Sequence, residues 1–252
     1  MVAGPLDKIK VVAIIQARMN SSRLPGKVLL PIPLPNGKPV VQWIIDELNN
    51  SSFNIKVVIA TSYNPENSIL YNYCISHSIN CYRGDEDDVL SRFIEIVKNE
   101  KVDVVIRLTA DNPLLDIKLL DKTIHYHLLQ RNDYTSSVGL PLGMNFEIIS
   151  PLALLSLQRV TTTKEEKEHV TPYIKKSNDY VKGKFKPYES NHLKDIRLTI
   201  DYSSDYLVVS QILVLSDFFS LHGIAIVEKI LLEYPWIFDC NSKNIQKSIN
   251  II

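Results

Sequence analysis

The stretch "IKVVAIIQARMNSSRLPGK", Ile9 to Lys27, decides the fold. Its first part, "IKVVAIIQA", is a nearly continuous apolar run, which is typical of a strand buried on both faces of a sheet. A polar loop that contains Pro25 and Gly26 follows at once. In open α/β sheets, ligands bind beyond the carboxyl ends of the strands. The loop after this strand is therefore the first place where a binding site is expected.

The next part of the chain alternates between helical and extended patterns. Apolar residues recur on one helical face in residues 38–50, and "IKVVIATS", Ile55 to Ser62, predicts a second strand. There follow a helix from about residue 65, a short strand at 79–84, a helix at 85–100 with acids in its first turn, and a buried strand at 102–110. This alternation predicts an α/β fold with a mostly parallel sheet and helices on both faces.

Beyond about residue 133 the alternation becomes irregular. Residues 133–138 and 145–150 predict strands, and residues 151–158 and 164–177 predict helices. The basic stretch "YVKGKFKPYE", residues 180–189, suggests an exposed hairpin arm, and "DIRLTIDY", residues 195–202, predicts another strand. Helices near 206–216 and 224–234 close the chain. We predict one domain over residues 1–252, with an irregular α+β insertion at about 138–190.

Charge and cysteine content narrow the class of protein. The formal charge is zero, from 28 basic and 28 acidic residues, so no global field attracts nucleic acid or a membrane surface. Cys74, Cys81 and Cys240 lack C-x-x-C spacing, which predicts reduced, mostly buried thiols. The first ten residues lack the apolar core of a signal peptide, and no apolar run reaches the length of a membrane span. We therefore expect a cytoplasmic protein with no nucleic-acid or membrane partner.

The loop after the first strand carries a cluster of cations. Arg18, Arg23 and Lys27 lie within ten positions. Small residues between them allow backbone N–H groups to turn inward and bind an anion, as in a polyphosphate cradle. The sequence of this loop matches neither a P-loop nor a G-x-G-x-x-G motif. Composition alone leaves open the alternative of a solvated basic loop. The small residues are Asn20, Ser21, Ser22 and Gly26.

The phrase Ala17-Arg18-x-x-Ser21-x-Arg23-Leu24-Pro25-Gly26-Lys27 resembles the sugar-acid cytidylyltransferases, which include the 3-deoxy-manno-octulosonate and acylneuraminate enzymes. It is most similar to the branch called spore coat polysaccharide biosynthesis protein F. The resemblance continues in order through "GDEDDVLSRF", "RLTADNPLLD", "EHVTPYI" and "RLTIDYSSD". It implies a Rossmann-like nucleotide-diphospho-sugar transferase fold. It also implies transfer of CMP from CTP to a sugar acid, with Mg²⁺ and release of pyrophosphate, by a homodimer active in surface polysaccharide synthesis.

The resemblance also implies roles for particular residues. The loop cations hold the triphosphate, and two aspartates bind the metal. Catalytic roles fall on Arg18, Lys27, Asp111 and Asp201. Nucleotide-binding roles fall on Ala17, Arg18, Asn20, Ser21, Ser22, Arg23 and Lys27. Position in the predicted sheet, and not the resemblance, adds Arg83 and Arg107 to the nucleotide-binding candidates, since both lie on strands that end at the same edge. Contacts to the acceptor sugar or the dimer, through the insertion, fall on Glu147, Glu168 and His169.

The two aspartates end two similar phrases, "IRLTADNP" at Ile106 to Pro113 and "IRLTIDYS" at Ile196 to Ser203. Both carboxylates are expected at the ligand edge, where Mg²⁺ takes one or two carboxylates together with phosphates and waters. The alternative is that each aspartate only forms a turn or a cap, and Ser203 or Ser204 can cap the helix that follows.

Several other polar residues keep two interpretations. Arg107 and Arg197 precede their aspartates by four positions, so each can touch phosphate or pair with that carboxylate. His169 can face the acceptor or form a surface pair with Glu165. His125 and His127 do not share a helical face, so a metal site there is not expected. Two positions differ from the residues usual in the resembled branch. Asn20 stands where the branch usually has Gly, and Asn can adopt the left-handed conformation that such a turn needs. Asn145 stands where the branch more often has an acidic residue.

Three functions remain to be compared. The first is a cytidylyltransferase for a sugar acid. The second is a nucleotidyltransferase that uses another NTP with a sugar-phosphate or polyol-phosphate acceptor. The third is a non-catalytic nucleotide-binding module, which the intact loop cations and both aspartates disfavour. The sequence does not identify the acceptor sugar.

Overall fold

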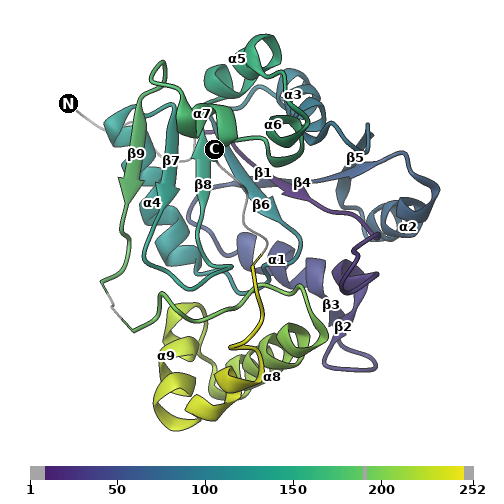
Figure 1. Cartoon of the computed structure of the whole chain (residues 1–252), viewed down its shortest axis with the longest axis vertical. Helices are drawn as coiled ribbons and strands as arrows, with labels where there is room; N and C mark the ends of the chain where they lie inside the picture. Colours follow the sequence, from purple (N-terminus) through teal and green to yellow (C-terminus); the bar gives the residue numbers. More distant parts are fainter. Residues whose placement is uncertain (1–8, 190–191, 247–252) are drawn as a thin grey trace.

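The computed structural model describes residues 9–189 and 192–246. The prediction that the first residues are not a signal peptide lies mostly outside this range. A mixed sheet with the order β5-β4-β1-β6-β8-β7-β9 forms the centre (Figure 1). Its strands are β1 (Val11–Gln16), β4 (Ile55–Ser62), β5 (Asn80–Gly84), β6 (Val104–Thr109), β7 (Tyr134–Ser137), β8 (Glu147–Ile149) and β9 (Lys182–Phe185).

The predicted parallel core is confirmed. β1 pairs in parallel with both β4 and β6, and β4 pairs in parallel with β5. β8 is antiparallel to its two neighbours, β6 and β7. A separate two-stranded sheet joins β2 (Pro31–Ile32) to β3 (Lys38–Pro39). The region predicted as an irregular insertion thus contributes β8 and β9 to the central sheet, and its role in acceptor and dimer contacts stays a prediction.

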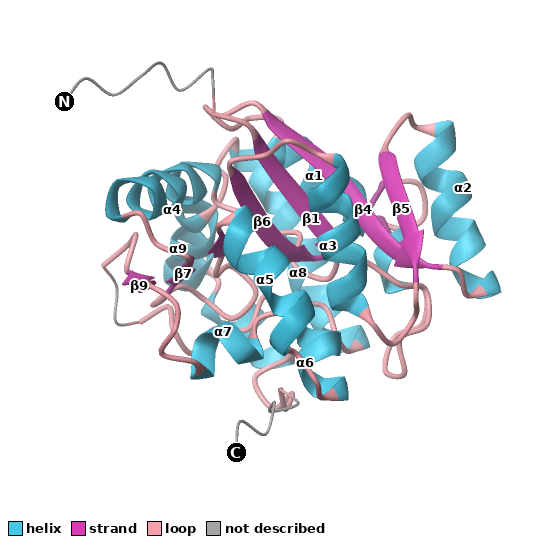
Figure 2. Cartoon of the chain, turned by 90° about the horizontal axis from the view of Figure 1, so that it is seen from above, coloured by secondary structure: helices cyan, strands magenta, loops and turns pink. Residues whose placement is uncertain are grey.

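Helices cover both faces of the sheet, as predicted (Figure 2). One face packs on α1 (Val40–Leu48), α2 (Ser68–Ser76), α4 (Ile117–Gln130), α8 (Ser203–Phe219) and α9 (Ile224–Glu233). The other face packs on α3 (Val89–Asn99), α5 (Pro151–Val160) and the segment that holds α7 (Pro172–Lys176). The 3₁₀ turns are η2 (Lys27–Leu29), η3 (Pro65–Asn67) and η4 (Pro235–Cys240).

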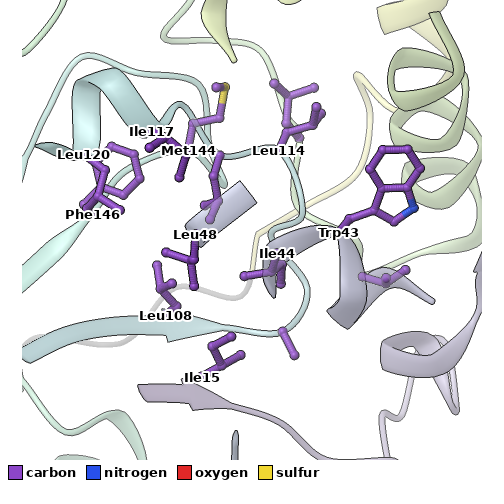
Figure 3. Close-up of a cluster of buried hydrophobic side chains, with 14 of the residues drawn as sticks. Ile15, Trp43, Ile44, Leu48, Leu108, Leu114, Ile117, Leu120, Met144 and Phe146 are labelled. Atoms are coloured by element: carbon purple, nitrogen blue, oxygen red, sulfur yellow. The ribbon is translucent and has the colours of Figure 1, made fainter. Parts of the chain in front are cut away.

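Alternation along β1 explains why this strand is apolar throughout. Ala13 and Ile15 belong to the core on the α1 face, whereas Val12 and Ile14 belong to the core on the α3 face. Successive side chains of a strand point to opposite faces, so a strand between two helical layers has no polar side. Figure 3 shows Ile15 of β1 in the first of these cores, with side chains from α1, β6 and α4.

Five local predictions were wrong. Residues 164–177 form two helices, α6 (Lys164–His169) and α7, because Val170 adopts a φ of 68° and Pro172 starts a new helix. The acids before α3 precede the helix, and Asp88 caps it by accepting from the Ser91 N–H. Residues 182–185 form the edge strand β9, which pairs in parallel with β7. They are not a hairpin arm, because a hairpin joins antiparallel strands. Cys240 is an exposed thiol and Cys81 is only partly buried.

The fifth wrong prediction is the strand at 195–202. This segment makes only an isolated bridge between Leu142 and Arg197. Its partner is the turn at Leu142 and Gly143, whose φ of 103° cannot continue a ladder. A Cβ on Gly143 would lie 2.8 Å from the Thr199 nitrogen, so glycine allows the two backbones to approach.

No single helix in the described ranges is long and apolar enough to cross a membrane. The helices α8 and α9, which meet at an angle of 102°, would together be long and apolar enough by length and composition alone.

Candidate active site

A cavity of about 820 Å³ opens at the carboxyl ends of β1 and β6. It brings together most of the residues predicted to form the site, although they come from four distant parts of the chain. These residues are Ala17, Arg18, Ser21, Ser22, Arg23, Lys27, Arg107, Asp111, Glu168, His169 and Asp201. Gln246, the last residue that the structure describes, also lines this cavity, and the sequence did not suggest it.

The loop after β1 closes on itself before it enters η2. The Gly26 N–H donates to the Met19 carbonyl at 2.8 Å, and Gly26 has a φ of 73°. The left-handed residue of the loop is therefore Gly26, not Asn20 as the sequence suggested. Asn20 is exposed, and its side chain does not line the cavity. The closed loop turns Lys27 back toward the sheet.

Lys27 joins the two aspartates. Its ammonium donates to Asp111 Oδ2 at 2.8 Å, to Asp201 Oδ1 at 3.0 Å and to the Ile200 carbonyl at 2.7 Å. Lys27 is only 8% exposed, so these contacts are shielded from water. The three donors of the ammonium group all have partners. The expectation that the fold brings both aspartates to one place is met, and a buried cation holds them there.

The backbones of the two phrases also meet. The Ile200 N–H donates to the Asp111 carbonyl at 2.8 Å. Asp111 Oδ1 accepts from Thr109 Oγ at 2.6 Å, which orients the carboxylate and leaves Oδ2 for Lys27. The predicted caps Ser203 and Ser204 are wrong, because Tyr202 occupies the N-cap position of α8. Asp205 accepts from the backbone N–H groups of Asp201 and Tyr202, just before the helix.

The other two loop cations differ in burial. Arg23 pairs with Asp201 Oδ1 at 2.9 Å, and its guanidinium lies 4.8 Å from the Tyr202 ring centroid. The Arg23 Nη1 group is buried without a hydrogen-bond partner, which suits a site that awaits an anion. Arg18 is 53% exposed and lies 3.8 Å from Glu86 and 4.0 Å from Glu168. Arg18 is therefore free to reorient when a ligand enters.

The two arginines that precede the aspartates behave differently. Arg197 pairs with its own aspartate, with 2.9 Å between Nη2 and Asp201 Oδ2. Arg107 lines the cavity but pairs with Glu147, at 2.8 Å. Glu147 also binds Lys175 at 2.5 Å. Burial by itself raises the pKa of Glu147, but Arg107 and Lys175 outweigh it and lower this pKa to about 2. Glu147 is thus an ionised support for Arg107.

The structure separates Arg83 from the other predicted residues. Its guanidinium donates to the Ser62 carbonyl at 3.0 Å and lies 5.5 and 5.1 Å from the rings of Tyr63 and Tyr71. It does not line the cavity. β5 is an edge strand of the sheet, and its end points Arg83 at the neighbouring η3 segment. We therefore do not place Arg83 in the nucleotide site.

Sequence reasoning missed Asn67, which supports the loop from behind. Its Oδ1 accepts from the Met19 N–H at 2.7 Å, and its Nδ2 donates to Ser62 Oγ at 2.7 Å and to Glu86 at 3.2 Å. Asn67 is 1% exposed. A single Asn in the short turn Pro65–Asn67 carries no local signal for this contact, because its partner lies 48 positions earlier.

Asp111 and Asp201 supply part of the ligand set that one Mg²⁺ ion needs. Asp111 Oδ2 and Asp201 Oδ1 converge on the same ammonium, so two carboxylate oxygens lie at one place. Mg²⁺ typically takes one or two carboxylates and completes its shell with phosphate and water. Over residues 9–189 and 192–246, no group of three or more His, Cys, Asp or Glu side chains could form a full cage. The phosphates of a substrate would have to supply the remaining ligands.

A Rossmann-like sheet with cations and carboxylates at its ligand edge defines the class as a nucleotidyltransferase. The model of the cytidylyltransferase family matches residues 12–230, and this chain belongs to that family. The family resemblance inferred from the loop motif is confirmed.

Two relatives extend this assignment. The spore coat polysaccharide biosynthesis protein SpsF of Bacillus subtilis is 37% identical over 202 residues, which cover 78% of this chain and 83% of the relative. An uncharacterized protein of Methanocaldococcus jannaschii is 35% identical over 243 residues, covering 95% and 98% of the two chains.

Solved structures share the fold. A cytidylyltransferase from Leptospira borgpetersenii superposes with a TM-score of 0.82 at 25% identity, covering 95% of this chain and 99% of the other. A CMP:2-keto-3-deoxy-manno-octonic acid synthetase complexed with CTP gives a TM-score of 0.63 at 14% identity, covering 82% and 99%. At this identity the second likeness concerns the fold alone.

Proposed function

We propose that this cytidylyltransferase transfers CMP from CTP to a sugar acid, with Mg²⁺, and releases pyrophosphate for surface polysaccharide synthesis. The observation that carries the proposal is the junction of Lys27 with Asp111 and Asp201 in one cavity, beside two further loop cations. The name of one relative supports it, since that relative is a spore coat polysaccharide biosynthesis protein.

Charge explains how the loop acts on CTP. A sugar hydroxyl attacks the α-phosphorus in line, and pyrophosphate leaves with extra negative charge on its bridge oxygen. Lys27 and Arg23 face the cavity from the loop and already bind carboxylates, so they can share their donors with phosphate oxygens. A preorganised donor of this kind contributes roughly 10²–10³ in rate.

Asp111 and Asp201 would hold the metal, which supplies Lewis-acid neutralisation of phosphate charge when bound. Asp111 is the more accessible of the two, with a side chain 24% exposed against 8% for Asp201. Lys27 lies between the two carboxylates, and it keeps them close together when no other cation is present.

A cluster of Arg107, Lys175 and Glu147 carries one net positive charge, and Arg107 lines the cavity. Arg107 and Lys175 both bind Glu147, so two cations share one carboxylate. The Nε of Arg107 is buried without a partner. A monoanionic carboxylate matches this charge better than a neutral polyol does. We therefore propose Arg107, with Glu147 as its support, on the side that receives the sugar acid, and Glu168 and His169 on the same wall.

Two further parts of the proposal rest on the family resemblance, namely dimerisation through the segment at about 138–190 and the choice of CTP over other nucleotides. A cytoplasmic location is proposed from the cysteine content, which is typical of reduced thiols.

Pyrophosphate release with purified protein and Mg²⁺ tests the proposal. Each of the four NTPs is combined with keto-sugar acids, sugar phosphates or polyol phosphates. Release that requires both CTP and a keto-sugar acid is the expected result. Release with another NTP or a phosphate acceptor would instead establish the second function considered above. NTP binding without release in any mixture would establish a non-catalytic nucleotide-binding module.

A further inference from the structure

The carboxylate of Asp201 is held from two sides. Its Oδ1 faces the cavity, where it binds Lys27 at 3.0 Å and Arg23 at 2.9 Å. Its Oδ2 binds Arg197 at 2.9 Å, on the side away from Lys27. The side chain is only 8% exposed, so water does not compete strongly for either oxygen. The orientation of Oδ1 toward the cavity therefore depends on where the Arg197 guanidinium lies.

Asp205 fixes Arg197 in turn. Arg197 Nε and Nη2 donate to the two Asp205 oxygens at 2.9 and 3.1 Å. Asp205 also accepts from the backbone N–H groups of Asp201 and Tyr202, both at 3.0 Å. Burial by itself raises the pKa of Asp205, but hydrogen bonds from Arg197, from Asn244 and from those backbone groups hold the pKa below its ordinary value. Asp205 is thus an ionised carboxylate without solvent exposure.

The last described residues complete this pair. We define the C-terminal strap as residues 241–246, which follow η4. Asn241 Nδ2 donates to Asp205 Oδ1 and to the Arg197 carbonyl, both at 3.0 Å. Asn244 Nδ2 donates to Asp205 Oδ1 at 2.7 Å. Gln246 Oε1 accepts from Arg197 Nη1 at 2.7 Å. Figure 1 shows this part of the chain, in yellow, running from the α8 and α9 helices toward the sheet.

We infer that the C-terminal strap is a positioning element for Asp201, acting through Asp205 and Arg197. This inference rests on the proposed catalytic role of Asp201. The strap lies beyond residue 230, where the match to the family model ends.

The physical reason is competition for one guanidinium. Arg197 carries a single charge and lies between two carboxylates, Asp201 and Asp205. Asn241 and Asn244 donate to Asp205 Oδ1, the oxygen that also accepts from Arg197 Nε. Part of the demand of Asp205 is thus met by amides, and Arg197 Nη2 is shared between Asp205 Oδ2 and Asp201 Oδ2. Gln246 holds Nη1, which fixes the plane of the guanidinium group. Loss of these donors leaves Asp205 to draw Arg197 toward itself, and Asp201 Oδ2 loses its fixed partner.

The test compares Asn244→Ala with Ser242→Ala in the full chain. Asn244 is partly buried and binds Asp205, whereas Ser242 is an exposed neighbour that binds only the Asp239 carbonyl, at 3.0 Å. Three quantities are measured for each variant and the wild type. They are the amide hydrogen exchange rates of Asp201 and Tyr202, the melting temperature, and kcat and KM for CTP from pyrophosphate release.

For Asn244→Ala we expect exchange at these two amides to rise about tenfold and kcat to fall about tenfold, with KM for CTP within about twofold of wild type. Ser242→Ala should match the wild type. Unchanged exchange and kcat in Asn244→Ala would overturn the inference. So would faster exchange spread evenly along the chain, which indicates general destabilisation. If the wild type releases no pyrophosphate with any acceptor, the proposed function fails, and the exchange comparison alone still decides the role of the strap.

Discussion

The segments 106–111 and 196–201 carry the same residue types at matching positions but lie in different surroundings. The first contains the end of β6, between β1 and β8 in the central sheet. The second lies outside the sheet and makes only an isolated bridge. Both nevertheless deliver an aspartate to Lys27. The shared position of the two carboxylates is therefore reached from two kinds of backbone.

The arginines of the two segments show what this difference means. In the sheet, Arg107 projects from the β6 face that is opposite the α1 core and meets Glu147 across the antiparallel pair with β8. Outside the sheet, Arg197 turns back to its own aspartate and to Asp205. The same residue type thus supports the acceptor side of the cavity in one segment and a carboxylate in the other. Three substitutions and one pairwise test examine this distinction.

Among the three substitutions, Lys27→Met should have the largest effect, because it removes the cation that joins the two segments. We expect kcat to fall by about a hundredfold or more. The melting temperature should also fall, since breaking a buried ion pair costs roughly 3–5 kcal/mol. Added Mg²⁺ should raise the melting temperature more in the variant than in the wild type. Lys98→Met, which removes an exposed lysine paired with Glu95, is the matched control. A Lys27→Met protein within threefold of wild-type kcat would contradict the assignment.

Arg107→Ala should have a smaller effect, confined to the acceptor. We expect KM for the sugar acid to rise about tenfold, equivalent to about 1.4 kcal/mol, with KM for CTP little changed. Steady-state kinetics with each substrate varied in turn would measure this. Arg83→Ala is the control, because Arg83 lies outside the cavity and should leave both constants unchanged. Equal rises in both KM values would place Arg107 on the nucleotide instead.

Glu147→Gln should show the smallest effect, a change in the pH dependence of stability. The pKa of Glu147 is lowered from 4.5 to about 2. A depressed folded-state pKa contributes stability that is present above about pH 4.5 and is lost as the pH falls toward 2. Denaturant unfolding should therefore show a difference between wild type and variant that is constant at neutral pH and narrows in acid. A difference that widens as the pH falls would contradict the ionised state of Glu147.

Much of the fold could be predicted from the sequence because burial on two faces leaves a clear pattern. β1, β4 and β6 read as continuous apolar runs, and their pairing follows from the alternation with helices. Segment 195–202 misled the sequence analysis, because its apolar residues are buried by packing without a ladder. The apolar pattern of this segment predicts that its side chains are buried, but it does not predict that its backbone is hydrogen-bonded in a sheet.

The residues of the candidate site also fall into a group that could be predicted from the sequence and a group that could not. The cations and both aspartates could be predicted, since each follows a strand or lies in the loop beyond one. Asn67, Asn241 and Asn244 could not, because each is a single amide whose partner lies 36 to 48 positions away in the chain. Lys27 was expected to bind only phosphate, and its contact with both carboxylates depends on how the loop folds back.

The central claim is that Asp111 and Asp201 act together at one place. The measurement that tests it most directly is kcat for pyrophosphate release by Asp111→Asn, Asp201→Asn and the double variant. We predict that each single variant loses about a thousandfold and that the double variant is little worse than either, because both changes remove the same site. Losses that multiply in the double variant, or wild-type turnover in either single variant, would contradict the claim.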